Sequence, residues 1–221
     1  IIYKMNSWAN NELPLRKGNY KIYGAFEQRQ NNYVIALEAT NTSEAYTLSF
    51  DEERNSFDSF LSYKPEMMCP LGVLFVTFKN GVPWTHDDEP YYNNFYGVQY
   101  DSRIKGVFNK DSFMKKTYIS ISEMASQVWY CPSIETSSKS YGNTKQSSNL
   151  IESDFSNFED NFYASLLRDA NSIGGINNGD YLKGNWISIL FESKSSNYPL
   201  NNLISLGAVS LKYNDSPLNN R

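Results

Sequence analysis

The densest set of residues that could bind a metal or transfer a proton is His86-Asp87-Asp88-Glu89, which includes the only histidine of the chain. Consecutive side chains of an extended chain point to opposite faces, so no more than two of these four could hold the same ion. The residue spacings of an EF-hand calcium loop and of an HExxH zinc site are both absent. We therefore interpret this segment as a solvated turn and predict no metal site.

Two further sets of carboxylates could in principle do chemistry. Asp51-Glu52-Glu53 follows a predicted strand and lacks the alternating Asp and Asn residues of a calcium loop, which favours a solvated loop. A carboxylate pair for glycoside hydrolysis needs only to meet in space. The available carboxylates are Glu52, Asp58, Glu152, Asp154, Glu159 and Asp169. Their availability alone is no evidence for such a pair.

The motifs of nucleophilic and phosphate-binding enzymes are missing. No GxSxG elbow marks a serine that could form a triad with His86, and neither GxxxxGK[ST] nor GxGxxG occurs. The glycine-rich segment 172–180 has no basic residue and is typical of a flexible turn. We predict no catalytic residue and no cofactor, and we expect the chain not to be an enzyme.

The two cysteines, Cys69 and Cys131, lie far apart in the sequence and each precedes a proline. This spacing gives neither a CxxC redox pair nor a zinc knuckle. Free cysteines are among the most buried residue types. We therefore predict two unpaired, buried thiols.

Aromatic residues are concentrated in the segment 83–97. They could stack against sugar rings or contact another protein. We favour packing between strands instead, because aromatic residues of β proteins usually cover a core or an edge. The residues concerned are Trp84, Tyr91, Tyr92, Phe95 and Tyr96.

The composition favours strands joined by many turns. Aromatic residues make up 15% of the chain, with 17 Tyr, which suits half-buried pleated surfaces. The net charge of −4 lacks the positive excess that binding to a phosphate backbone demands, so we do not expect direct nucleic-acid binding. No apolar run reaches the roughly 18 residues of a membrane-spanning helix.

The pattern of apolar runs predicts an antiparallel meander over 19–50. A β-hairpin should follow, because 74–79 alternates between two faces and Asn80-Gly81 supplies the two positive-φ positions of a type I′ turn. Segment 137–148 has few apolar groups and predicts an exposed loop, while 158–169 shows a helical pattern. Further strands are expected at 59–63, 102–109, 118–121, 128–130, 186–191 and 204–213.

Several passages follow one another in a distinctive order: SFDE, FKNG, NFYG, KTYISI and VWYCPSIET, which begin at residues 49, 78, 94, 116 and 128. This order resembles the tail muzzle or tail stabilisation family, which comprises large structural proteins from the tails of crAss-like phages that infect Bacteroides. The resemblance covers 18–221 and is most specific between 48 and 97.

The resemblance implies an all-β chain with three regions. An N-terminal extension, 1–17, would precede a propeller-like or meander β module, 18–112, completed by another chain or fragment. A β-sandwich-like domain, 113–221, would carry the exposed loop 137–148. The chain does not begin with Met, which fits a processed C-terminal fragment.

The resemblance also implies a structural virion protein that is assembled in the host cytoplasm as part of a ring or muzzle at the portal-distal end of the tail. The expected partners are other copies of the chain, an upstream fragment of the same precursor, and a portal-associated ring or other tail proteins. Two other classes stay open from the residues alone. The aromatic residues and amide-rich loops would also suit a carbohydrate-binding module, and the carboxylates would suit a glycan-cleaving enzyme.

Overall fold

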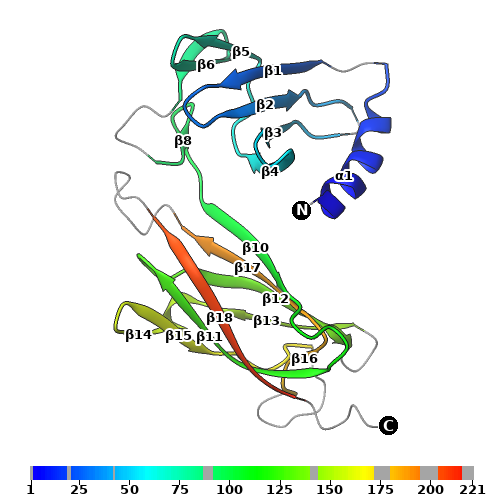
Figure 1. Ribbon diagram of the computed structural model, residues 1–221, viewed down its shortest axis with the longest axis vertical. Helices are drawn as coiled ribbons and strands as arrows, with labels where there is room; N and C mark the ends of the chain where they lie inside the picture. The colour runs from blue at the N-terminus through cyan, green and yellow to red at the C-terminus, as the bar shows by residue number, and fades with distance from the viewer. Residues whose placement is uncertain are drawn as a thin grey trace. The chain divides into compact units, whose positions relative to one another are not determined.

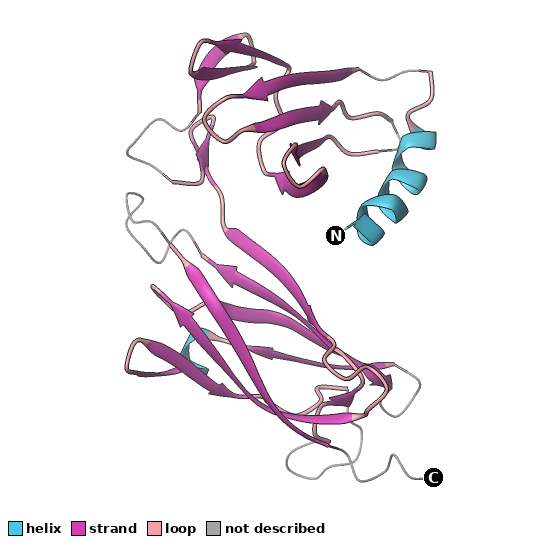
Figure 2. Cartoon of the chain, in the orientation of Figure 1, coloured by secondary structure: helices cyan, strands magenta, loops and turns pink. Residues whose placement is uncertain are grey.

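The computed structural model describes residues 2–18, 21–41, 43–86, 92–139, 144–171, 180–194 and 204–215, with side chains from Trp8 onward. The chain divides into two compact units: unit 1, Ile1–Tyr100, and unit 2, Asp101–Arg221. Strands make up most of the described residues in both units (Figures 1 and 2), which confirms the predicted all-β class. No helix among the described residues has the length and apolar content to cross a membrane.

Unit 1 begins its sheet with a four-stranded antiparallel meander in which each strand pairs with the next along the chain. Asn31 and Asn55 have positive φ angles in the tight turns of this sheet, as short amide side chains tolerate. The predicted meander is therefore confirmed. Its strands are β1 (Ile22–Glu27), β2 (Asn32–Leu37), β3 (Tyr46–Asp51) and β4 (Ser56–Leu61).

A helix, α1 (Ile2–Leu15), lies beside one end of this meander in the view of Figure 1 and contacts β4. The Trp8 ring meets Tyr46 and Phe60 edge to face, with ring centroids 5.2 and 5.5 Å apart. Such aromatic pairs add specific attraction to the burial of their area. The segment predicted as an N-terminal extension thus contributes side chains to the packing of unit 1.

Arg16 fastens the end of α1 to the loop between β2 and β3. The guanidinium is buried and donates hydrogen bonds to the carbonyl oxygens of Glu38, at 2.5 Å, and Glu44. Its Nη2 also lies 3.5 Å from Oε2 of Glu12 one helical turn earlier. Because the rigid fork of arginine meets three oxygens, the helix is held in a defined place on the sheet.

The other face of the meander packs through Val34 and Ala36 against a second, three-stranded sheet. Here Lys79 pairs with Val82, and Asn80 and Gly81 have φ angles of 52° and 74°, which confirms the predicted hairpin. This sheet consists of β5 (Met67–Leu71), β6 (Leu74–Lys79) and β7 (Val82–Thr85), followed by the short pair β8 (Asn94–Phe95) and β9 (Val98–Gln99).

Unit 2 is a sandwich of two antiparallel sheets, seen from the side in Figure 1. The first sheet has the order β10 (Ser102–Phe108), β17 (Ile187–Ser193), β12 (Tyr130–Lys139) and β13 (Lys145–Leu150). The second sheet is centred on β11 (Lys116–Ala125), which pairs with β15 (Asn161–Ser165), β16 (Lys183–Gly184) and β18 (Leu206–Asp215). The strand β14 (Ser156–Phe158) flanks β15 and follows the short 3₁₀ turn η1 (Glu152–Asp154).

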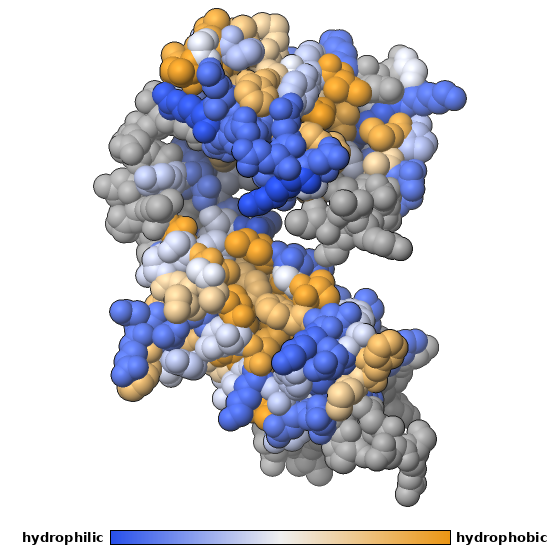
Figure 3. Space-filling model, viewed as in Figure 1, coloured by the Kyte–Doolittle hydropathy of each residue, from blue (hydrophilic) through white to orange (hydrophobic). Residues whose placement is uncertain are grey.

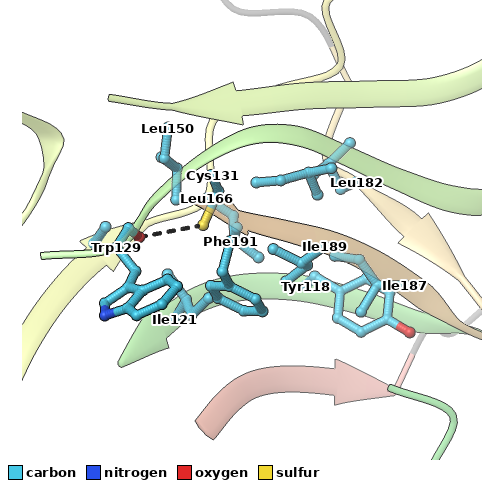
Figure 4. Packing of buried hydrophobic residues seen from close by; sticks show 12 residues of the cluster. Tyr118, Ile121, Trp129, Cys131, Leu150, Leu166, Leu182, Ile187, Ile189 and Phe191 are labelled. Atoms are coloured by element: carbon cyan, nitrogen blue, oxygen red, sulfur yellow. Dashed lines mark hydrogen bonds between the residues drawn. The ribbon is translucent and has the colours of Figure 1, made fainter. Parts of the chain in front are cut away.

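The core of unit 2 lies between these sheets. Figure 4 shows the side chains of β11, β12 and β17 interleaving, with Phe191 beside Trp129 and Ile189 beside Tyr118. Alternation along β17 buries Ile187, Ile189 and Phe191 on the inner face, as a strand period of two requires. The predicted strands at 118–121, 186–191 and 204–213 are all present.

Three expectations differ from the structure. The helical pattern at 158–169 is wrong, because β14 and β15 form a hairpin whose turn uses positive φ at Glu159 and Asp160. The loop predicted at 137–148 is shorter, since β12 extends to Lys139 and β13 begins at Lys145. Backbone hydrogen bonds hold the two strands together, and the polar side chains of Gln146 and Ser148 on β13 are buried. Finally, β10 pairs with β17 of unit 2, whereas the sequence-based boundary after residue 112 grouped it with the first module.

Candidate functional site

His86, the residue that attracted attention first, is buried in unit 1, with 8% of its surface exposed. Its backbone N–H donates to the carbonyl of Phe75 at 3.0 Å, which extends the pairing of β6 and β7 by one step. The other members of the predicted acidic turn, Asp87, Asp88 and Glu89, lie outside the described residues. The imidazole itself therefore belongs to the core of unit 1 and not to a solvated turn, which corrects that part of the prediction.

A chain of three hydrogen-bonding side chains runs through this core. The His86 Nε2 atom lies 2.6 Å from Oγ1 of Thr77, and the same oxygen lies 2.8 Å from the hydroxyl of Tyr96. Burial raises the pKa of Tyr96, so its hydroxyl stays protonated near neutral pH and can donate. Buried polar groups need such partners, and Thr77 serves both neighbours.

Aromatic rings enclose the imidazole on several sides. Its ring centroid lies 4.4 Å from that of Tyr63, 5.6 Å from that of Phe75 and 5.8 Å from that of Phe95. Trp84 meets Tyr96 edge to face at 5.7 Å. Of the five aromatic residues singled out in the sequence, Trp84, Phe95 and Tyr96 pack in this cluster, Tyr92 is exposed and Tyr91 is outside the described residues.

Three of the carboxylates singled out in the sequence accept backbone N–H groups: Asp51 of the acidic set 51–53, and Asp154 and Asp169 of the candidates for glycoside hydrolysis. Asp51 accepts the N–H of Arg54 at 3.0 Å in the β3–β4 turn, and Asp154 accepts the N–H of Ile151 at 2.8 Å. Asp169 is buried and its Oδ1 accepts the N–H groups of Ser147 and Asn171, at 3.0 and 3.1 Å. Glu52, Asp58, Glu152 and Glu159 are exposed. Within the described ranges, no three His, Cys, Asp or Glu residues are grouped so that they could hold a metal ion.

The two thiols are unpaired, as predicted, but only one is fully buried. Cys131 lies in the core of unit 2, whereas Cys69 is half-buried on β5. The prediction of burial is wrong for Cys69, because β5 lies at the edge of its sheet and leaves one side open.

The segment that is similar to a known family begins in the last residues of unit 1 and continues into unit 2. Residues 90–169 match the family of the Crassvirus muzzle protein C-terminal domain. Residues 90–169 are therefore similar to a muzzle C-terminal domain. This match confirms the family that the sequence passages predicted, and it includes three of those passages, NFYG, KTYISI and VWYCPSIET. No curated protein matches the chain.

The sandwich of unit 2 extends beyond the segment of this chain that matches the muzzle family. The match ends at Asp169, yet β17 lies between β10 and β12, and β18 pairs along the whole of β11. Removing 183–215 would therefore leave β10 without a partner strand, and would take β17 from β12 and β18 from β11. The matched segment therefore covers only part of the strands of unit 2.

Glu123 is an ionisable group in the interior of unit 2. It is fully buried, its Oε2 accepts the backbone N–H of Trp129 at 3.1 Å, and its Oε1 has no hydrogen-bond partner among the described residues. Burial raises the pKa of Glu123 to about 7, and the hydrogen bond from Trp129 offsets only part of that rise. The neighbouring Cys131 thiol has its pKa raised by burial and by the Glu123 charge, so it stays protonated and unreactive.

Lys116 is a second buried charge that sequence reasoning missed. Its ammonium donates to the carbonyl oxygens of Asp111, Met114 and Asn185, at 3.0, 3.3 and 2.7 Å. An ammonium has three donors, and here each finds an acceptor. The position at the start of a strand gave no signal, because the three carbonyls come from a turn and from a segment almost 70 residues away.

Proposed function

We propose that this chain is a structural component of a phage tail that assembles as part of a ring or muzzle at the portal-distal end. The single observation that carries the proposal is the match of residues 90–169 to the muzzle C-terminal domain. This match supports the interpretation of the chain as a phage structural protein and as a component of the virion. The finer statements, on ring assembly and on position in the tail, are part of the proposal, as is assembly in the host cytoplasm.

The proposal assigns the chain no catalytic role. The groups that could have formed a site have other uses: His86 is enclosed by aromatic rings, Asp169 receives two backbone N–H groups, and Lys116 holds a turn. Side chains committed to packing and to backbone carbonyls serve a rigid building block. These contacts favour a structural role over a glycan-cleaving one.

Contact with other tail proteins would use the edges of the sheets. Among the described residues, β1 and β4 each have one strand partner in unit 1, and β10, β13 and β18 each have one in unit 2. An edge strand carries N–H and C=O groups that can pair with another chain. We propose that neighbouring copies and other tail proteins cover some of these edges.

Cryo-electron microscopy of purified phage particles tests the proposal. Density for the two-sheet sandwich is expected at the end of the tail farthest from the portal, repeated around the tail axis. If the sandwich fitted density only in the capsid shell, or in no part of the particle, the proposed position and assembly would be wrong.

A further inference from the structure

The turn between β10 and β11 presents the most exposed large apolar side chain of the described residues. Phe113 has 97% of its surface exposed, and the next is Phe158 at 65%. Met114 beside it is 41% exposed. Hydrophobic residues also gather on the surface over β10 and β18 in the view of Figure 3. A single exposed apolar residue is common on protein surfaces and is no evidence of a binding site. The evidence that Phe113 binds a partner has to come from the conformation of its turn.

This turn is fixed by side chains that reach it from the rest of the fold. The buried Lys116 ammonium binds the carbonyl oxygens of Asp111 and Met114, on either side of Phe113. The amide of Asn185 donates to the carbonyl of Ser112 at 2.9 Å. The N–H of Met114 donates to the carbonyl of Asp111 at 2.9 Å, and Asp111 has a φ of 50°.

The result is an aromatic side chain on a rigid support. Ordering a surface turn costs conformational entropy, and in the isolated chain Phe113 gains no burial in return. A partner that receives a pre-ordered side chain avoids that cost at the moment of binding. Aromatic anchors of this kind supply much of the energy of protein interfaces.

The surroundings of the turn are basic. Segment 101–116 contains five Lys or Arg and two Asp. The side chains of Lys105 and Lys110 are exposed, as is Val107 between them. A partner surface for Phe113 should therefore combine apolar area with negative charge.

Unit 1 of the same chain has that chemistry. Residues 1–100 contain 8 Lys and Arg against 12 Asp and Glu, a net charge of −4, whereas 101–221 contain 12 of each. The β3–β4 hairpin exposes Glu52, Glu53 and Asp58, and the nearby Phe60 is half exposed. Unit 2 as a whole is neutral, but the positive excess of segment 101–116 is opposite in sign to the net charge of unit 1. This local complementarity suits a head-to-tail contact between copies, which closes into a ring when the rotation allows.

We propose that Phe113 and its basic flanks dock onto the β3–β4 hairpin of a second copy of this chain. The contact is heterologous, with unit 2 of one copy against unit 1 of the next. This inference deepens the proposed ring assembly and rests on it. Phe113 acts as the apolar anchor, and Lys105 and Lys110 orient the approach.

Sedimentation velocity of the 221-residue chain, over a concentration series at low and high salt, tests this contact. The wild-type chain should self-associate, and more weakly at high salt. Phe113→Ala should lower the association constant at least tenfold, because a truncated anchor typically has effects of that size. Phe158→Ala is the matched control, since it removes an exposed Phe from the end of strand β14, and it should sediment like the wild type.

A charge exchange identifies the partner surface. The variant carrying Lys105→Glu and Lys110→Glu, and the variant carrying Glu52→Lys and Asp58→Lys, should each be monomeric alone and should associate when mixed. All four changes are at exposed positions, and circular dichroism should show unchanged folding. A wild-type chain that stays monomeric, a mixture that does not associate, or equal weakening by Phe158→Ala would overturn the inference.

Incorporation into particles separates this inference from the proposed function. Phage carrying Phe113→Ala should assemble far fewer particles that contain the chain. If that variant enters particles at the wild-type copy number, the docking role of Phe113 is wrong while the structural role stands. If the wild-type chain is absent from particles, the structural role itself is rejected.

Discussion

The Nε2 atom of His86 lies 2.6 Å from Oγ1 of Thr77, inside a ring of aromatic side chains. This contact turns the only imidazole of the chain into a part of the core. The Thr77 hydroxyl also contacts the hydroxyl of Tyr96, so this one side chain forms hydrogen bonds with two neighbours in unit 1.

Thr77→Val should destabilise unit 1. The substitution keeps the shape of the side chain but removes the hydroxyl that contacts the buried His86 Nε2 and the half-buried Tyr96 hydroxyl, at a cost of about 1–3 kcal/mol. Urea unfolding followed by tryptophan fluorescence measures the loss. Thr77→Ser keeps the hydroxyl and should retain most of the stability; equal losses in the two variants would show that the hydrogen bonds do not matter.

The buried Glu123 predicts that unit 2 loses stability as the pH rises. Its pKa is raised from 4.5 to about 7 by burial, so folding favours the protonated form. The contribution of protonated Glu123 to the free energy of unfolding is fully present below pH 4.5, and it is lost as the pH rises through about 7. The corresponding free energy is on the order of 3 kcal/mol.

Glu123→Gln should remove this pH dependence. The Gln carbonyl can still accept the N–H of Trp129, and no charge forms at high pH. Thermal unfolding between pH 5 and pH 8 measures the slope, with Glu135→Gln as a control at a partly exposed carboxylate. A slope that persists in Glu123→Gln would assign the dependence to another group.

The two thiols should differ in reactivity. In the native chain, a thiol reagent should label Cys69, which is half-buried, and leave Cys131 unmodified, because Cys131 is buried and its pKa is raised. Both should react after unfolding in guanidinium chloride. Mass spectrometry of the labelled chain tests this order, and native labelling of Cys131 would contradict the packing of the unit 2 core.

Lys116→Met should be severely destabilising. The change leaves the carbonyls of Asp111, Met114 and Asn185 without their donor, at a cost of about 1.5–3 kcal/mol, the range for a hydrogen bond to a charged group. Lys110→Met is the matched control at an exposed position and should change stability by less than about 0.5 kcal/mol. Similar unfolding midpoints for the two variants would show that the buried ammonium does not hold the turn.

The sequence predicted the parts of the fold that depend on local pattern. The Asn80-Gly81 hairpin and the alternating strand β17 carry their structure in adjacent residues, so both were predicted correctly. The prediction for segment 158–169 was wrong because its conformation depends on distant residues. Its apolar spacing resembles that of a helix, but β15 pairs with β11, which lies about 40 residues earlier in the chain.

The candidate sites were less predictable than the fold. The burial of Lys116 depends on a carbonyl from Asn185, and that of Arg16 on carbonyls from Glu38 and Glu44. Contacts between residues so far apart in the chain leave no local pattern. The burial of His86 could not be predicted for the same reason. The rings that enclose it include Tyr63, which precedes it by 23 residues, and Phe95, which follows it by 9.

Quantitative mass spectrometry of purified phage particles tests the central claim, a structural role in the virion, most directly. The chain should be present at a fixed number of copies per particle, in a constant ratio to the other tail proteins across preparations. Particles that remain infectious and contain none of the chain, with all of it left in the cell lysate, would contradict the account.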